Sequence, residues 1–348
     1  MSVEPEIICE KRGAAGVVTL NRPHALNALT HGMVRVLAPA LAAWSSDPSV
    51  TRIIVEGAGD RAFCAGGDIR ALYEAGSRGD HAGPLAFWRD EYSLNAFIAR
   101  YPKPYVALID GIVMGGGVGL SLHGSHRVAG DRYLFAMPEV GIGFFPDVGA
   151  TYALPRLPGR TGIWLALTGD RVKAADALAL GLANHRVPSA RMADLRSALI
   201  DGEDVDAALV AHDAPRDGAL PSIERATIQD CFSGHSVNDI LARLDAFRTP
   251  FAAKAAATIR TKSPTSLKVA FEQMRRGGSL SFAEAMETEY RIVSRIVRGH
   301  DFYEGVRAVI VDKDNAPRWS PPDLDAVDDD VVAEHFNSLG ADEWRVET

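Results

Sequence analysis

Apolar and polar residues alternate along the first half of the chain in short β-type runs and longer helical runs. Residues 7–9 and 17–20 are typical of two strands that form a hairpin around intervening glycines. Thr30 is placed to cap a helix that extends to about Trp44, because apolar residues recur there every three or four positions. The same periodicity predicts a helix over residues 84–100. Together these elements predict an α/β body.

Two further runs, residues 52–56 and 105–109, are apolar enough to be buried strands. In the second half the composition shifts to Ala, Leu and Arg, and the pattern becomes mostly helical. We therefore expect an α/β core over residues 1–187 and a mostly helical C-terminal region, residues 188–348, packed on it. The tail 317–348 carries an acidic run and is expected to be a solvated surface.

Composition limits the functions that the chain can have. A formal net charge of −8 over 348 residues argues against a nucleic acid partner. Cys9, Cys64 and Cys231 are too few and too scattered for a disulfide framework or a zinc site. The longest apolar stretch, residues 105–122, is broken by an aspartate and glycines, so we expect no membrane partner. Residues 1–6 have no presequence character, and cytoplasm is the expected location.

Two glycine-rich segments stand between a predicted strand and a predicted helix. Residues 61–69 contain a glycine pair just before Asp68, where a helix is expected to begin. Residues 110–120 contain three consecutive glycines and precede an apolar helix over residues 118–123. Such clusters can direct free backbone N–H groups at one oxyanion, although an ordinary turn explains a glycine pair equally well. The Lys-Ser/Thr ending of a phosphate-binding loop is missing.

A third segment, residues 137–149, places two carboxylates among apolar, Gly and Pro residues. Low polarity around Glu139 and Asp147 raises the pKa of a carboxyl group and makes it a better base at neutral pH. Two neighbouring carboxylates often divide acid and base roles. For Asp147 a second interpretation stays open, because it could instead cap a helix over residues 148–154.

Other candidate groups fit known chemistry less well. Ser121 lies one residue off a nucleophile elbow, because His123 stands where the motif needs glycine. His123 and His126 have no third metal ligand in the pattern, and no metal is expected. Cys64 is interpreted as a small buried residue.

The three segments, together with an opening motif at residues 20–29, resemble the crotonase (enoyl-CoA hydratase/isomerase) superfamily over residues 6–187. This resemblance implies a core of repeated ββα turns that form a spiral, followed by a helical region. It also implies that two backbone N–H groups, those of Gly67 and Gly116, polarise the thioester carbonyl of an acyl-CoA. Members of the family are often trimers or dimers of trimers, so the resemblance implies a homo-oligomer, a trimer or a hexamer.

The chain is most similar to the 3-hydroxyisobutyryl-CoA hydrolase branch of this superfamily. Hydratases use two glutamates to add water to a double bond; the first would fall on Gly119, which has no side chain, and the second on Glu139. Asp147 stands where hydratases usually have glycine. The resemblance therefore implies hydrolysis of 3-hydroxyisobutyryl-CoA to 3-hydroxyisobutyrate and CoA, a step of valine catabolism. The segments that carry it are residues 116–124, 135–139, 145–149, 165–169, 304–308 and 312–314.

The resemblance also implies roles for single residues. Glu139 is the general base for water or attacks the thioester itself, and both routes stay open. Asp147 positions the acyl group or water and helps to protonate the thiolate. Glu91 accepts a hydrogen bond from the substrate hydroxyl, unless it is an ordinary surface glutamate. CoA would be the substrate's own carrier, with no separate cofactor. The residues expected to bind CoA are Arg22, His24, Arg61, Ala65 and Asp68.

Two rival functions remain at this point. The first is an enoyl-CoA hydratase or isomerase of the same fold, since an isomerase can work with one carboxylate. The second is an acyl-CoA-binding protein without catalysis, which the presence of both Glu139 and Asp147 disfavours. Fold resemblance by itself decides neither.

Overall fold

The computed structural model describes residues 4–214 and 222–347. The chain folds into two compact units, each assembled from three separate segments. The first unit comprises Met1–Asp68, Ser93–Phe135 and Arg171–Ala219. The second comprises Ile69–Tyr92, Ala136–Asp170 and Leu220–Thr348. The division at residue 187 that the sequence suggested stays a prediction.

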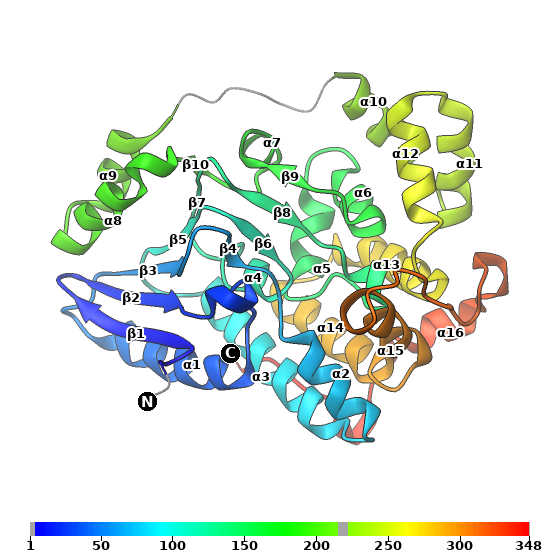
Figure 1. The fold of residues 1–348 in the computed structure, drawn as a ribbon, viewed down its shortest axis with the longest axis horizontal. Helices are drawn as coiled ribbons and strands as arrows, with labels where there is room; N and C mark the ends of the chain where they lie inside the picture. Colours follow the sequence, from blue (N-terminus) through cyan, green and yellow to red (C-terminus); the bar gives the residue numbers. More distant parts are fainter. Residues whose placement is uncertain (1–3, 215–221, 348) are drawn as a thin grey trace. The chain divides into compact units, whose positions relative to one another are not determined.

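The first unit is built on two β-sheets (Figure 1). The six-stranded sheet has the order β1-β2-β3-β5-β7-β10, with β1 and β2 antiparallel and the following neighbours parallel. Its strands are β1 Ile7–Arg12, β2 Ala15–Leu20, β3 Arg52–Gly57, β5 Tyr105–Ile109, β7 His126–Ala129 and β10 His185–Arg186. The four-stranded sheet has the order β4-β6-β8-β9. Its strands are β4 Ala62–Cys64, β6 Ile112–Met114, β8 Leu134–Ala136 and β9 Val172–Lys173.

The larger sheet has a central strand, β5, that is apolar along its whole length. All five residues of β5 are buried, as expected for a parallel strand with both faces covered. Val17, Ile54 and Val106 pack against Leu195 and Leu199 of the overlying helix α8. The helices are α1 His31–Ser46, α4 Gly116–Gly119, α7 Ala174–Leu180, α8 Met192–Asp201 and α9 Val205–His212, with 3₁₀ turns η1 Pro23–Ala25 and η4 Ser189–Arg191.

The second unit is mostly helical, and its elements come from distant parts of the sequence. Helix α3 runs over Ala82–Ala99, and its first part, up to Tyr92, belongs to the second unit. The other helices are α2 Ile69–Ser77, α5 Ala150–Ala153, α6 Thr161–Thr168, α10 Ser222–Cys231, α11 Val237–Phe247, α12 Pro250–Ile259, α13 Pro264–Gly277, α14 Phe282–Ile296, α15 His300–Val306 and α16 Asp329–Glu334. The shorter turns are η2 Glu139–Ile142, η3 Leu154–Arg156, η5 Arg307–Val311, η6 Leu324–Ala326 and η7 Gly340–Asp342.

Most expected elements are confirmed, and the bounds of one helix are wrong. The hairpin, the helix capped by Thr30 and the strand β5 are as predicted. The helix expected over residues 118–123 is α4, which begins two residues earlier and has four residues. One physical reason is that the Ser121 hydroxyl donates to the Gly117 carbonyl, so a side chain competes for the backbone acceptors of the helix.

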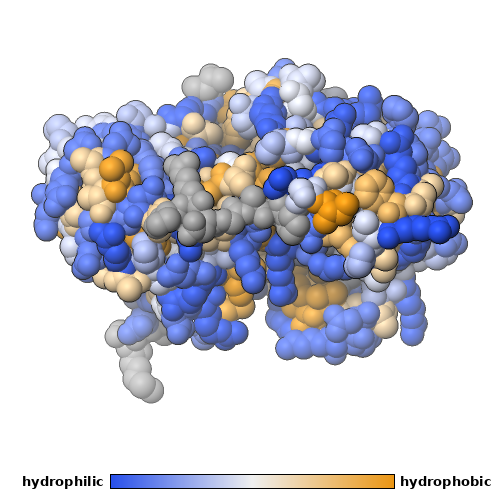
Figure 2. Space-filling view, turned by 90° about the horizontal axis from the view of Figure 1, so that it is seen from above, coloured by the Kyte–Doolittle hydropathy of each residue, from blue (hydrophilic) through white to orange (hydrophobic). Residues whose placement is uncertain are grey.

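The surface is largely hydrophilic on the face that Figure 2 shows, with apolar residues in separate groups. Over the described residues, no helix has the length and apolar character that crossing a membrane requires. The acidic tail is not wholly a solvated surface, because Val332 and Phe336 are buried. The trimer or hexamer expected from the resemblance stays a prediction.

Candidate active site

In the first unit, the two glycine segments lie against each other. A Cβ atom on Gly66 would stand 4.0 Å from the Gly115 Cα atom. Gly117 has no room for a side chain at all, because a Cβ atom there would collide with the Cys64 carbonyl oxygen. This close approach of α4 to β4 explains one glycine of the cluster as a packing requirement.

In the part of the chain that the structure describes, the N–H groups of Gly67 and Gly116 lie outside the backbone pairing. Leu29 pairs with Gly67 through bonds that use Gly66 O and Asp68 N, so the N–H of Gly67 lies outside this pairing. Gly116 is the first residue of α4, and the first N–H groups of a helix have no acceptor within it. Both glycines were predicted to form an oxyanion hole, and this role stays a prediction.

A buried asparagine shapes the loop that precedes the first glycine segment. Asn27 is fully buried, and its amide donates to the carbonyls of Ala58 and Ala62 at 2.9 Å each. Its oxygen accepts the N–H of Arg22 at 2.9 Å. Asn27 adopts φ 57°, a left-handed conformation that asparagine tolerates better than most residues. These contacts give Asn27 a structural role in this loop.

The predicted CoA-binding residues differ in how free they are to bind an anion. Arg22 is largely committed to the fold, because its guanidinium pairs with Asp68 at 3.0 Å and with Glu6 at 3.0 Å. His24 and Arg61 are exposed. Ala65 is half-buried, and its N–H donates to Leu26 O at 3.0 Å. Contacts of any of these residues with CoA remain a prediction.

In the second unit, the buried carboxyl groups of Glu91, Glu139 and Glu289 gather around that of Asp147. Their exposed fractions are 2% for Glu91, 7% for Glu139, 5% for Asp147 and 0% for Glu289. Tyr92, next to Glu91 on α3, donates its hydroxyl to Asp147 Oδ2 at 2.9 Å. Glu91 is therefore buried, and the alternative interpretation of Glu91 as an ordinary surface glutamate is wrong. Within the described part of the chain, Glu91 Oε1 and Glu139 Oε2 have no hydrogen-bond partner.

Burial makes ionisation of this cluster costly. It raises the pKa of Asp147 to about 7, although the hydrogen bond from Tyr92 opposes the rise. Burial, followed by repulsion from Asp147, holds the pKa of both Glu91 and Glu139 well above the usual range. The same causes raise the pKa of Glu289 to about 8. Because each ionisation opposes the next, the cluster holds protons at neutral pH and can both donate and accept them.

The hydrogen bonds indicate where the first negative charge lies. Asp147 receives the Tyr92 hydroxyl, which stabilises a carboxylate, whereas Glu139 Oε2 has no such donor among the described residues. The free protein therefore favours the charge on Asp147 and the proton on Glu139. The sequence had suggested Glu139 as the general base or the nucleophile, and this role stays a prediction. Because the two carboxyl groups are coupled, they titrate as a pair.

The turn that carries Asp147 is conformationally strained. Asp147 does not cap a helix: α5 begins at Ala150 and its N-cap is Gly149, with φ 90°. The preceding Val148 has φ 53°, which is an outlier for a β-branched residue. Such a conformation costs about 1–3 kcal/mol and persists only where the surroundings impose it. The helix-cap interpretation of Asp147 is thus wrong.

Glu289 was not identified from the sequence. A capping box of Ser281 and Glu284 starts α14, with Glu284 accepting the Ser281 N–H at 2.8 Å. Glu289 then falls on the stripe of buried residues that includes Ala285 and Val293. A glutamate on an apolar stripe is the signal that could have found it.

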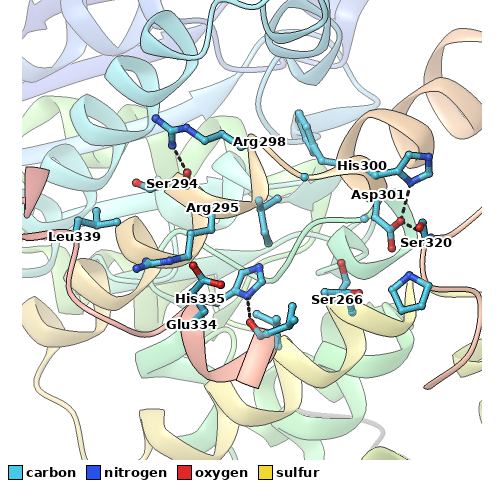
Figure 3. A pocket seen from close by; sticks show the side chains of 18 of the residues that line it. Ser266, Ser294, Arg295, Arg298, His300, Asp301, Ser320, Glu334, His335 and Leu339 are labelled. Carbon is cyan, nitrogen blue, oxygen red and sulfur yellow. Dashed lines mark hydrogen bonds and ion pairs between the residues drawn. The ribbon is translucent and has the colours of Figure 1, made fainter. Parts of the chain in front are cut away.

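A cavity elsewhere in the second unit, of about 650 Å³, is lined by none of the predicted site residues (Figure 3). Side chains that line it bind other residues of the protein. Arg298 donates to the Ser294 carbonyl, and His300 contacts Asp301 at 3.1 Å. His335 is bonded to the Val331 carbonyl at 2.8 Å. Over residues 4–214 and 222–347, no group of three or more His, Cys, Asp or Glu residues could hold a metal ion.

Comparison with known proteins places this chain in a family. The sequence model of the enoyl-CoA hydratase/isomerase family matches residues 15–336. The chain belongs to this family, and the expected crotonase-like fold is confirmed. One solved structure, named as a carnitinyl-CoA dehydratase from Mycobacterium thermoresistibile, has a TM-score of 0.92 and 45% identity, covering 96% of this chain and 97% of that chain.

Curated relatives carry a more specific name. A mitochondrial 3-hydroxyisobutyryl-CoA hydrolase from Danio rerio is 48% identical over 96% of this chain and 90% of the relative. The Homo sapiens protein of the same name is 45% identical over 98% of this chain and 90% of the relative. These relatives are named as mitochondrial proteins, which contradicts the cytoplasmic location expected from the sequence.

Proposed function

We propose that the protein hydrolyses the thioester of 3-hydroxyisobutyryl-CoA, releasing 3-hydroxyisobutyrate and free CoA. The observation that carries the proposal is the buried carboxyl cluster centred on Asp147, together with the absence of a side chain at Gly119. The names of the curated relatives support the same substrate. A role in valine catabolism is part of this proposal.

In the proposed reaction, the N–H groups of Gly67 and Gly116 bind the thioester oxygen and stabilise the tetrahedral oxyanion. Losing one such donor typically costs about 10²–10³ in rate. The pair of Glu139 and Asp147 supplies one base and one acid. The base removes a proton from water as the water attacks the carbonyl carbon, and the proton is then returned to the departing thiolate. Glu91, with one oxygen unpartnered in the described structure, accepts the hydrogen bond of the substrate hydroxyl.

A hydratase or dehydratase is the second candidate, because two similar solved structures carry such names. The structure named as an enoyl-CoA hydratase from Rhodobacter sphaeroides has a TM-score of 0.90 and 42% identity, covering 99% of this chain. Gly119 disfavours this function, since the first hydratase glutamate is expected at that position. Asp147 also stands where the hydratases that the chain resembles have glycine.

The test compares two reactions on the same preparation. Free-thiol release from 3-hydroxyisobutyryl-CoA is followed beside loss of the conjugated double bond of crotonyl-CoA. We expect thiol release without hydration. We further expect Asp147→Asn to lower kcat by about 10²–10⁴, the range for loss of an acid–base group, while CoA binding persists. Asp245→Asn is the matched control, because Asp245 is an exposed partner of Arg260. Hydration without thiol release would establish the hydratase instead.

A further inference from the structure

The turn at Asp147 is held by hydrogen bonds on both sides of that residue. After Asp147, Glu289 accepts the N–H of Gly149 through Oε2 at 2.8 Å and the N–H of Thr151 through Oε1 at 2.9 Å. Both oxygens of the Glu289 carboxyl group therefore accept hydrogen bonds from the backbone of the turn. Glu289 is fully buried, so these bonds are shielded from competition with water.

A second helix, α13, binds the turn on both sides of Asp147. Gln273 of α13 donates to the Pro146 carbonyl at 2.5 Å and to the Thr151 hydroxyl at 2.7 Å. Gln273 is also fully buried. The two helices thus bind the residues that flank Asp147, while Tyr92 binds its carboxylate. The strained backbone of Val148 lies inside this set of contacts.

We propose that Glu289 is a positioning residue for catalysis: with Gln273 it clamps the turn of residues 146–151, so that Asp147 meets water and substrate in one fixed geometry. This inference deepens the proposed thioesterase and rests on it. Fixed geometry matters because a catalytic group misplaced by about 1 Å can cost on the order of 10²-fold in rate. A left-handed valine will not keep the turn in place by its own preference.

The first variant is Glu289→Gln, which keeps the size of the side chain but replaces one acceptor oxygen with an NH₂ donor. Only one of the Gly149 and Thr151 N–H groups then keeps its acceptor. We expect kcat to fall about 10- to 100-fold, with KM changed less than about threefold, because the turn moves while substrate contacts elsewhere persist. A lower melting temperature with kcat unchanged would show a purely structural role and overturn the proposal.

The matched control is Glu287→Gln on the same helix. Glu287 pairs with Arg345 and accepts the Val346 N–H at 3.3 Å, away from the turn. We expect its kcat to stay within about twofold of the wild type. A second test variant, Gln273→Met, removes the other half of the clamp. Because both residues act on one turn, the double variant Glu289→Gln/Gln273→Met should lose less than the product of the single losses. Strictly multiplicative losses would overturn a shared clamp.

Amide hydrogen exchange measures the clamp without any substrate. We expect the amides of Gly149 and Thr151 to exchange faster in Glu289→Gln than in the wild type and in Glu287→Gln. Unchanged exchange would overturn the clamp, whatever the activity. If the wild type releases no thiol from 3-hydroxyisobutyryl-CoA, the proposed function fails, and faster exchange would still identify Glu289 as the clamp of this turn.

Discussion

The hydroxyl of Tyr92 offers a direct test of the acid–base pair. It donates to Asp147 Oδ2 at 2.9 Å inside a fully buried cluster, and Tyr92→Phe removes only this hydrogen bond. A hydrogen bond to a charged group is worth about 1.5–3 kcal/mol, and about 1.4 kcal/mol corresponds to one pKa unit. The bond favours ionised Asp147, so its loss raises the pKa further above its present value of about 7.

The expected result is a shift of the acidic limb of kcat/KM to higher pH, by about one to two pH units. At pH 6 the variant should therefore be about 10- to 100-fold slower than the wild type. The two rates should converge as the pH rises beyond the shifted limb, where both proteins have lost the same proton. The limb reports the first ionisation of the whole carboxyl pair, so the result does not depend on which member is the base.

The assay is thiol release from 3-hydroxyisobutyryl-CoA between about pH 5.5 and 9.5, corrected for spontaneous hydrolysis. Tyr101→Phe is the control, because the Tyr101 hydroxyl makes a bond of the same length, 2.9 Å, to the Leu41 carbonyl outside the cluster. A Tyr92→Phe profile that superimposes on the wild type would refute the reasoning, and so would a limb moved to lower pH.

Two further predictions concern stability. Below about pH 7 the folded protein keeps on Asp147 a proton that the unfolded chain releases near pH 4, so the free energy of unfolding falls as the pH rises from about 4 through 7. Asp147→Asn removes this pH dependence. In urea unfolding, the free energy of unfolding of the variant minus that of the wild type should rise by about 2–4 kcal/mol between pH 5 and 8. A difference that does not change with pH would contradict this prediction. Gly117→Ala forces a methyl group against the Cys64 carbonyl and should cost about 1–3 kcal/mol or more. Gly278→Ala, with open space around the added atom, is its control, and equal melting temperatures would contradict the packing argument.

Local sequence was sufficient to find the groups that lie within short motifs. The glycine clusters stood out because they recur between a predicted strand and a predicted helix, and the family resemblance then singled out Gly67 and Gly116, whose role stays a prediction. Glu139 and Asp147 were found because carboxylates are rare in an apolar loop. In the structure these carboxylates are buried as that reasoning required.

Contacts across long stretches of chain could not be predicted in this way. Tyr92 lies within the helix predicted over residues 84–100, and nothing in the sequence of that helix shows that its hydroxyl meets Asp147, 55 residues later. The helix-cap interpretation of Asp147 failed because Val148 and Gly149 both take left-handed conformations, which delay the start of α5. Propensity would not place a valine there; the contacts of α13 and α14 with the turn do.

The clamp on the Asp147 turn also has a consequence for biosynthesis. Its hydrogen bonds join residues separated by 127, 138 and 140 positions in the chain. At about 5–20 residues per second, the ribosome adds a stretch of that length in roughly 6–30 seconds. A nascent chain that already contains Glu91, Glu139 and Asp147 therefore waits for α13 and α14 before the turn can close. Premature termination before α14 would yield a product with every predicted catalytic side chain and no fixed place for Asp147.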